Sequence, residues 1–162
     1  MKNRARDAVM EVHRAFKERG GTLAVAESCT GGLLAHWLTE VAGASSFFLG
    51  GVVAYAEGMK TRVLGVPGAS IEERGVVSEA CARLMAEGVR ALAGADYALG
   101  TTGNLGPDAL EGKPRGLIYV AASAPGETRA RELRLGGSRH QNKEEAALAA
   151  LELLLTLIEA HG

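Results

Sequence analysis

Apolar segments of two different lengths alternate along the first two thirds of the chain, and this order most constrains the fold. Short runs of strand length are followed by segments whose apolar residues recur every three or four positions. The strand-like runs cover 22–26, 47–55 and 96–100, and the helical patterns cover 5–19, 33–41 and the segment after Ser78. Such alternation favours parallel strands with helices packed on both faces of the sheet.

The last third of the chain breaks this alternation. Two strand-like runs, 116–123 and 129–135, are separated by a Pro-Gly turn, which is typical of an antiparallel hairpin, and a helical pattern then covers 141–161. The chain has 162 residues, the length of one ordinary domain. We therefore predict a single domain over residues 1–162 with an α/β fold, a three-layer α/β/α sandwich whose mixed sheet is partly antiparallel.

Glycine and capping signals predict finer features. Two glycines inside the run 47–55 predict a β-bulge, and a short helix is expected over 57–64. The sequence Ser-Ile-Glu-Glu at 70–73 fits a capping box, and the Gly- and Pro-containing segment 101–115 predicts a loop. Because the chain has 22 glycines but only one Trp, three Tyr and three Phe, we expect its backbones to pack closely.

Charge and composition exclude several classes of protein. With 18 Lys and Arg against 19 Asp and Glu, the net charge of −1 gives no bulk basic surface for nucleic acid. The two cysteines form no disulfide framework or four-ligand zinc site by themselves, and the four histidines lack metal-ligand spacing. A signal peptide and an apolar run of membrane-spanning length are both missing, so we predict a soluble, cytoplasmic protein. We also expect no metal or other cofactor, because the sequence shows no ligand set for one.

The first candidate for chemistry is the segment 26–32, AESCTGG, which joins a predicted strand to a predicted helix. Its glycines allow the backbone to approach a ligand, and the helix N-terminus would favour a phosphate or a developing oxyanion in front of Ser28. Thr30, Gly31 and Gly32 are therefore candidates for binding substrate. A simpler interpretation also stays open, in which Ser28 or Thr30 caps the helix and the glycines permit a tight turn.

A serine nucleophile needs a base, and none of the four histidines is well placed to supply one. Lys60 follows the second predicted strand in a largely apolar stretch, where burial would lower its pKa and let it reach a neighbouring strand end. A solvated surface lysine is the alternative. Cys29 is a rival nucleophile, because a helix N-terminus favours a thiolate, whereas Cys81 lies in a helical pattern typical of the core.

Two further clusters contain side chains suited to substrate contact. Thr102, Gly103 and Gly106 follow the third predicted strand, and ligands of open α/β sheets bind at the carboxyl ends of strands; a plain loop explains them equally well. The segment 136–143 brings Arg139 to the mouth of the last predicted helix, where it suits phosphate capture or a solvated helix start.

Taken together, these clusters resemble the CinA C-terminal domain family, the nicotinamide mononucleotide deamidases, over about residues 5–160. The matching motifs, in chain order, are AESCTGG at 26–32, GVVAY at 51–55, Lys60, LGV at 64–66, GVVS at 75–78, Gly103, GPD at 106–108, KP at 113–114, Gly116, Gly137 and Arg139. The resemblance implies hydrolysis of the carboxamide of nicotinamide mononucleotide to nicotinate mononucleotide and ammonia. It implies Ser28 as the nucleophile and Lys60 as its activating lysine.

The resemblance also assigns supporting residues. Tyr55 falls at the family's tyrosine and would hold Lys60 or the hydroxyl in place. Thr102 occupies the position of a hydroxyl residue, commonly serine. Arg139 matches the family's Gly-x-Arg arginine, and we infer from its charge that it would meet the phosphate. The chain departs from the family pattern around the expected site, at Ala56, Glu57, Asn104, Ala109 and Leu110.

These departures keep two other functions open. One is a nucleotide-binding module without turnover, and the other is an interaction protein of DNA uptake or repair, although the net charge argues against direct contact with nucleic acid. Members of the family often carry a second, N-terminal domain, for which we expect no room in this chain. We expect a small-molecule nucleotide as the ligand, no membrane contact, and a homodimer.

Overall fold

Five strands form one mixed sheet in the order β2-β1-β3-β4-β5 in the computed structural model, which describes residues 1–162. The strand β1 (Leu23–Glu27) pairs in parallel with β2 (Phe48–Val53) on one side and with β3 (Tyr97–Gly103) on the other. The strands β4 (Leu117–Ala124) and β5 (Glu127–Arg134) continue the sheet as an antiparallel hairpin. Every residue of β1 is buried, as expected for a strand flanked on both sides and covered on both faces.

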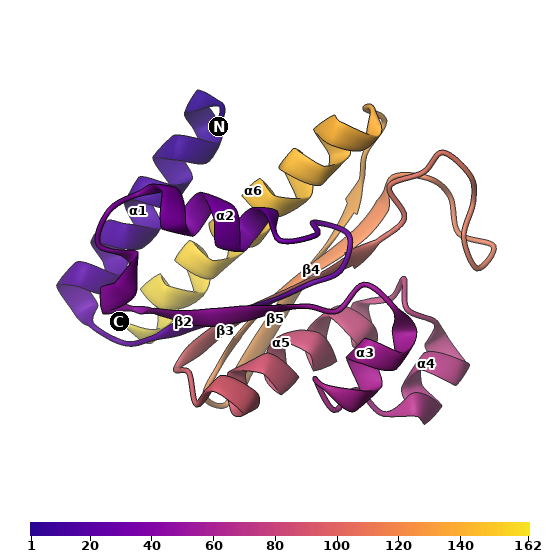
Figure 1. Cartoon of the computed structure of the whole chain (residues 1–162), viewed down its shortest axis with the longest axis horizontal. Coiled ribbons are helices and arrows are strands. Elements are labelled where there is room, and N and C mark those ends of the chain that lie inside the picture. The colour runs from indigo at the N-terminus through magenta and orange to yellow at the C-terminus, as the bar shows by residue number, and fades with distance from the viewer.

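Helices cover both faces of the sheet, and the three predicted layers are confirmed (Figure 1). One face carries α1 (Asn3–Arg19), α2 (Leu33–Glu40) and α6 (Arg139–His161). The other face carries α3 (Glu57–Arg62), α4 (Gly68–Arg74) and α5 (Glu79–Ala93), and a short 3-10 turn, η1 (Ala44–Ser46), precedes β2. None of the helices combines the length and apolarity needed to cross a membrane.

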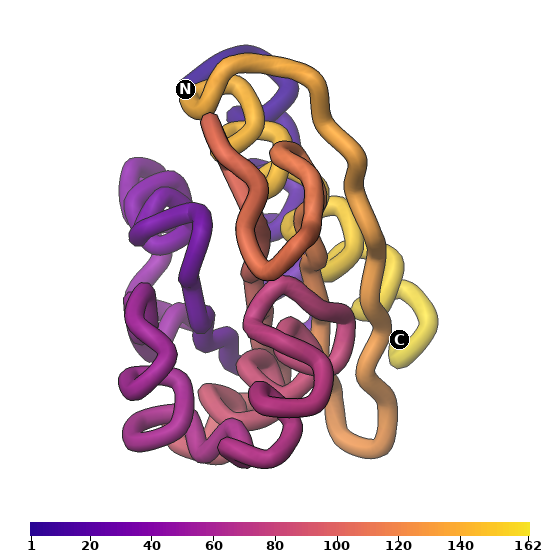
Figure 2. The backbone as a smooth tube through the Cα atoms, turned by 90° about the vertical axis from the view of Figure 1, so that its right-hand side faces the viewer, coloured from indigo at the N-terminus to yellow at the C-terminus, as the bar shows by residue number.

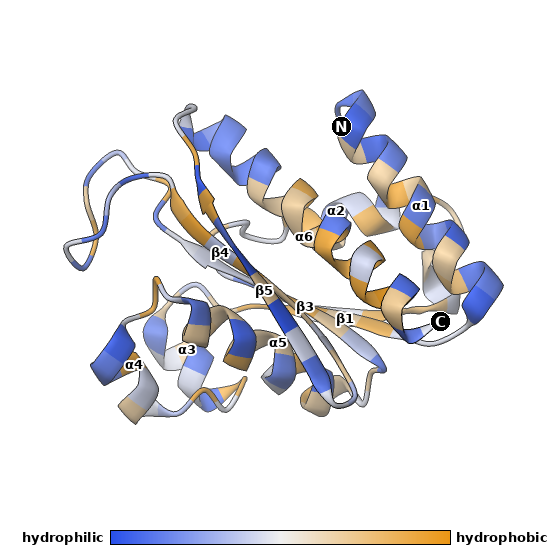
Figure 3. Cartoon of the chain, turned by 180° about the vertical axis from the view of Figure 1, so that it is seen from behind, coloured by the Kyte–Doolittle hydropathy of each residue, from blue (hydrophilic) through white to orange (hydrophobic).

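The layers pack closely because small residues lie where backbones meet. A Cβ added to Gly100 would lie 2.5 Å from the Ala82 carbonyl oxygen, so α5 rests almost directly on β3. A Cβ at Gly88 would lie 2.0 Å from the Leu64 carbonyl oxygen. The hydropathy colouring shows apolar residues on the inner sides of the helices and a largely polar β5 at one end of the sheet (Figure 3). The prediction of close backbone packing is confirmed.

Several local predictions are confirmed by hydrogen bonds. Ser78 caps α5 by accepting a hydrogen bond from the Cys81 backbone N–H, at 3.1 Å. The predicted last helix is present, but it begins at Arg139 and not at 141, because Ser138 and Gln141 form a reciprocal capping box there that was not predicted from the sequence. The register of β1 against β2 shifts between Leu23 and Ala24, which confirms the predicted bulge in the Gly-Gly strand.

Two local predictions are wrong. The residues 70–73 form no capping box, because α4 already begins at Gly68, and Pro67, whose ring fixes φ near its helical value, stands at the N-cap position. The predicted loop 101–115 starts too early, since β3 continues to Gly103 through pairing with β4, with Thr101 opposite Val120. Long-range pairing of this kind leaves no local sequence signal.

Candidate active site

The parallel strands β1, β2 and β3 end at the same edge of the sheet, and the candidate residues collect there. Ser28 follows β1 directly, and Lys60 lies on α3, the first helix after β2. Thr101 and Thr102 are near the end of β3, just before its last residue, Gly103. The ends of neighbouring parallel strands are only about 5 Å apart, so groups distant in the sequence meet at this edge.

Ser28 and Lys60 are in direct contact. The Lys60 Nζ atom lies 3.0 Å from the Ser28 Oγ atom, and it also donates to the carbonyl oxygens of Ala54 at 2.8 Å and Tyr55 at 3.0 Å. Lys60 is only 1% exposed and Ser28 only 8%. The interpretation of Lys60 as a solvated surface lysine is therefore wrong.

The buried position of Lys60 disfavours its charged form. Burial lowers the pKa of Lys60 below its ordinary value, although Cys81, Cys29, Glu57 and Glu111 pull it back upward in part. A neutral amine has two N–H bonds and one lone pair. The two carbonyl oxygens accept the N–H bonds, so the remaining tetrahedral direction, which holds the lone pair, faces the Ser28 hydroxyl. Such an arrangement suits the activation of a serine hydroxyl by a general base.

A cavity of about 310 Å³ opens beside this pair. Seven of the residues predicted from the sequence line it: Ser28, Tyr55, Lys60, Thr102, Gly103, Gly106 and Arg139. The other lining residues are Cys29, Val76, Asn104, Leu105, Pro107, Asp108, Ala109 and Leu110. The sequence had pointed to Cys29 only as a rival nucleophile and to Asn104, Ala109 and Leu110 only as departures from the family pattern. The volume falls at the lower end of the range for small-molecule sites, about 300 to 1,000 Å³.

Thr30, Gly31 and Gly32 do not line the cavity. Thr30 is fully buried, and its hydroxyl donates to Glu27 Oε1 at 2.7 Å and lies 2.8 Å from Thr101 Oγ1. Gly31 and Gly32 have φ values of 59° and 102°, which are costly for residues with a side chain. These three residues build the turn that carries Ser28, so the expectation that they contact substrate has no support in the geometry.

Glu27 is the residue that sequence reasoning missed. Its carboxylate, only 1% exposed, accepts hydrogen bonds from the Thr30 hydroxyl and from the backbone N–H groups of Leu34 at 2.8 Å and Ala35 at 3.1 Å. Glu27 therefore satisfies the first turn of α2. Neither Ser28 nor Thr30 caps this helix, and its N-terminal amides are not free to hold a ligand anion. A carboxylate at the end of an apolar strand was the available signal, because such a buried charge needs partners.

Tyr55 supports Lys60 through its main chain and not through its ring. The phenolic oxygen of Tyr55 accepts a hydrogen bond from Arg139 Nη2 at 3.0 Å, and Arg139 Nη1 donates to the Gly106 carbonyl oxygen at 2.7 Å. The expectation that Tyr55 holds Lys60 in place is therefore met by its carbonyl oxygen, at 3.0 Å from Lys60 Nζ, and not by its phenol. The side chains of Tyr55 and Arg139 instead join three segments around the mouth of the cavity.

The loop between β3 and β4 forms one wall of the cavity and is tied to the connection between α4 and α5 (Figure 2). Glu111 accepts hydrogen bonds from the backbone N–H groups of Val76 and Val77. Partial burial disfavours the Glu111 carboxylate, but these donors and Lys113 outweigh it and hold its pKa below the ordinary value. Asn104 staples the loop internally by donating to the Asp108 carbonyl oxygen and accepting from the Gly106 N–H.

The two thiols are poorly suited to nucleophilic chemistry. Cys29 lines the cavity but is only 4% exposed, and burial raises its pKa to about 12, with a smaller opposing effect from the Thr101 hydroxyl. Burial likewise raises the pKa of Cys81 to about 11. Since the thiolate is the nucleophilic form, Cys29 is a weak rival to Ser28 near neutral pH.

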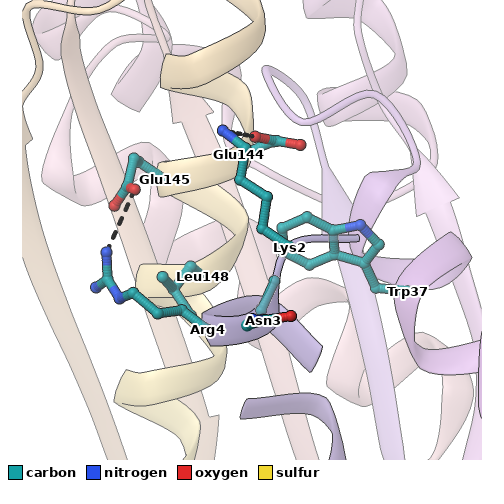
Figure 4. Close-up of a pocket in the computed structure, with 8 residues that line it drawn as sticks. Lys2, Asn3, Arg4, Trp37, Glu144, Glu145 and Leu148 are labelled. Carbon is teal, nitrogen blue, oxygen red and sulfur yellow. Dashed lines mark ion pairs between the residues drawn. The ribbon is translucent and has the colours of Figure 1, made fainter. Parts of the chain in front are cut away.

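A second cavity, of about 420 Å³, lies between the start of α1, Trp37 of α2 and the first turns of α6 (Figure 4). Its charged groups are paired, Lys2 with Glu144 at 3.1 Å and Arg4 with Glu145 at 3.5 Å. No serine, cysteine or histidine lines it. It is larger than the cavity at Ser28 but offers no serine or cysteine nucleophile.

The fold and the site together define a three-layer α/β protein with a buried serine–lysine pair at the carboxyl edge of its sheet. The chain belongs to the CinA C-terminal domain family, whose model matches residues 5–158. The family predicted from the sequence motifs is thereby confirmed.

Relatives of known name agree with this family. The chain is 46% identical over 144 residues to a CinA-like protein of Geobacter sulfurreducens and 49% identical over 138 residues to one of Gloeobacter violaceus. These matches cover 88% and 83% of this chain but only 35% and 32% of the relatives, so the chain spans about a third of their length.

Solved structures match over nearly whole chains. A CinA superfamily protein of Klebsiella pneumoniae 700603 is 34% identical, with a TM-score of 0.93 over 98% of this chain and 99% of that one. The competence/damage inducible protein CihA of Agrobacterium tumefaciens is 33% identical, with a TM-score of 0.93 over 97% of each chain.

Proposed function

We propose that this protein is a nicotinamide-nucleotide amidase, which hydrolyses the carboxamide of nicotinamide mononucleotide to nicotinate mononucleotide and ammonia. The observation that carries the proposal is the 3.0 Å contact between the Lys60 Nζ and Ser28 Oγ atoms, two residues that line the same cavity. The substrate follows from the resemblance of the motifs, and the reaction class follows from the chemistry of a serine with a neutral lysine.

The first half of the reaction forms an ester on the enzyme. Neutral Lys60 accepts the hydroxyl proton of Ser28 while the Ser28 oxygen bonds to the carboxamide carbon. The carbonyl oxygen becomes an oxyanion, for which the backbone N–H group of Cys29 is the candidate donor, since Cys29 lines the cavity and this group donates to no oxygen of the protein. Protonated Lys60 then delivers its proton to the leaving nitrogen, the C–N bond breaks, and ammonia departs.

The second half restores the enzyme. Lys60, neutral again, accepts a proton from a water molecule as the water oxygen bonds to the ester carbon. The tetrahedral intermediate collapses, the bond between the carbon and the Ser28 oxygen breaks, and Lys60 returns the proton to that oxygen. The net reaction adds one water to the amide and releases a carboxylic acid and ammonia, so every proton is accounted for without an oxidant or reductant.

Arg139 is the cation best placed for a nucleotide phosphate. Its guanidinium lies at the mouth of the cavity, and both of its observed partners, Gly106 O and Tyr55 Oη, are uncharged. A phosphate would supply the ionic partner that the guanidinium lacks. The substituted loop residues Asn104, Ala109 and Leu110 line the same cavity, so they would set the preference among related nucleotides.

Ammonia release from nicotinamide mononucleotide by the purified chain tests this proposal. Turnover that disappears in Ser28→Ala, with binding of the nucleotide retained, supports the amidase. Binding without turnover in the unsubstituted protein would instead support a nucleotide-binding module on the same fold. The names of several relatives refer to competence and damage, but the net charge of −1 gives no general attraction to nucleic acid.

A further inference from the structure

The two edges of the sheet are built from opposite kinds of residue. The β5 edge carries five charged side chains, Glu127, Arg129, Arg131, Glu132 and Arg134. The β2 edge carries none, and no Asp, Glu, Lys or Arg occurs anywhere in 41–56, although these residues make up 23% of the chain. Charges on an edge strand normally prevent it from pairing with another chain. The charges therefore protect the β5 edge from pairing with another chain, whereas the β2 edge has no such protection.

Apolar side chains are exposed along the open edge. Leu49 and Val53 of β2 are 50% and 49% exposed, and Tyr55 and Met59, which follow the strand, are 62% and 39% exposed. These are four of the eight large hydrophobic residues that are exposed in the whole chain, gathered within eleven positions. The edge of β2, between α2 and α3, is covered by no other element of the fold (Figure 1).

The backbone of β2 also has unused hydrogen-bonding groups. The Ala54 N–H donates to the Glu27 carbonyl oxygen, so position 54 faces β1. Polar groups along a strand alternate in direction, and the N–H and C=O groups of Val53 and Gly51 therefore point away from the sheet. Beyond Gly50 toward the N-terminus the bulge interrupts this alternation.

We propose that a second copy of this chain pairs with β2 as an antiparallel strand, so that two five-stranded sheets form one continuous sheet. In the register centred on Val52, Gly51 and Val53 of one copy face Val53 and Gly51 of the other, and these pairs exchange four hydrogen bonds. The missing side chain at Gly51 leaves room for Val53 across the pair. A two-fold axis through Val52 makes the edge complementary to itself, with no like charges opposed.

This interface also lies next to the cavity. Continued past Val53, the same register brings Tyr55 beside the bulge of the partner's β2, so the partner would cover part of the exposed ring that holds Arg139. The pairing itself does not depend on the proposed reaction. It gives the homodimer that we expected from the sequence a defined surface and symmetry.

Light scattering after size-exclusion chromatography of the purified full chain tests the pairing. We expect a dimer for the unsubstituted protein, and for Val53→Lys and Leu49→Lys a dissociation constant raised by about 100-fold or more. Val53→Lys sets two like charges diagonally across the pairing, and Leu49→Lys buries a charge against the apolar side chains of the partner. Leu92→Lys, at an equally exposed leucine on α5, is the matched control and should remain dimeric. Circular dichroism verifies that each variant is folded.

The register has a test of its own. Val52→Cys should form a disulfide between copies under mild oxidation, because residues on the axis of a non-hydrogen-bonded pair lie about 4.5 Å apart between Cα atoms. The native Cys29 and Cys81 are buried and should not react. A protein that is monomeric at all accessible concentrations, a dimer that both lysine variants leave intact, or a dimer in which Val52→Cys does not cross-link would overturn the proposal.

Discussion

Replacing Lys60 distinguishes the two roles that a buried lysine can have beside a serine. Lys60→Met removes both the charge and the proton acceptor, whereas Lys60→Arg keeps the charge but cannot release its proton near neutral pH. If Lys60 is the base, both variants lose the same function. General-base catalysis contributes about 10²- to 10⁴-fold, so we expect kcat to fall by that factor in each variant.

The structure adds a geometric reason for the failure of arginine. Lys60 is 1% exposed and its Nζ atom is enclosed by Ser28, Ala54 and Tyr55, all within 3.0 Å. A guanidinium is larger and planar, and it cannot place a lone pair opposite the hydroxyl. Arginine should therefore restore little activity relative to methionine.

The pH profile gives an independent measure of the same role. Lys60 must be neutral to accept the serine proton, so kcat/KM should rise with pH and level off above the pKa of Lys60. Burial places that pKa below the ordinary 10.5, which moves the rise toward neutral pH. Both variants should lose this limb, because neither has a group that titrates there.

Ammonia release from nicotinamide mononucleotide, followed between pH 6 and 10, is the assay, and calorimetric binding of the nucleotide shows that each variant keeps its site. Lys17→Met, at an exposed lysine on α1, is the matched control and should keep the full rate. A Lys60→Arg enzyme with more than a tenth of the normal rate has lost less than about 1.4 kcal/mol of transition-state stabilisation. Such a result would refute the role in proton transfer and leave Lys60 as a fixed charge.

Four further outcomes are expected. Ser28→Ala should lower kcat by several orders of magnitude with nucleotide binding retained, and acid quench with mass spectrometry should find an ester on Ser28 in the active protein. Cys29→Ala should keep most of the activity, and a thioester at Cys29 would contradict this. Glu27→Gln should lower the free energy of unfolding, measured in urea, by about 1 to 3 kcal/mol, because an amide cannot accept all three hydrogen bonds. At pH values between the lowered pKa of Lys60 in the folded protein and its ordinary value of 10.5, Lys60 carries a proton in the unfolded protein but not in the folded one. The free energy of unfolding should therefore rise with pH in that window, and Lys60→Met should abolish this rise.

The sequence by itself determined the elements and the turn that carries the nucleophile. Apolar periodicity and glycine positions predicted the layers, and Ser78 marked one helix start, because these signals act within a few residues of the backbone they control. The family motifs also named Ser28 and Lys60. The sequence left open whether Lys60 is exposed to solvent, because the exposure of a side chain depends on residues that are distant along the chain.

Only the tertiary structure decided how these residues meet. Lys60 approaches Ser28 across 32 positions, and Arg139 reaches Tyr55 across 84, because sheet order brings separate strand ends to one edge. The same packing extended β3 beyond its local signal, took Thr30 out of the site and gave Glu27 its partners. Contacts of this kind depend on which strands become neighbours, and that choice reflects the burial of the whole sheet and not the propensity of any one segment.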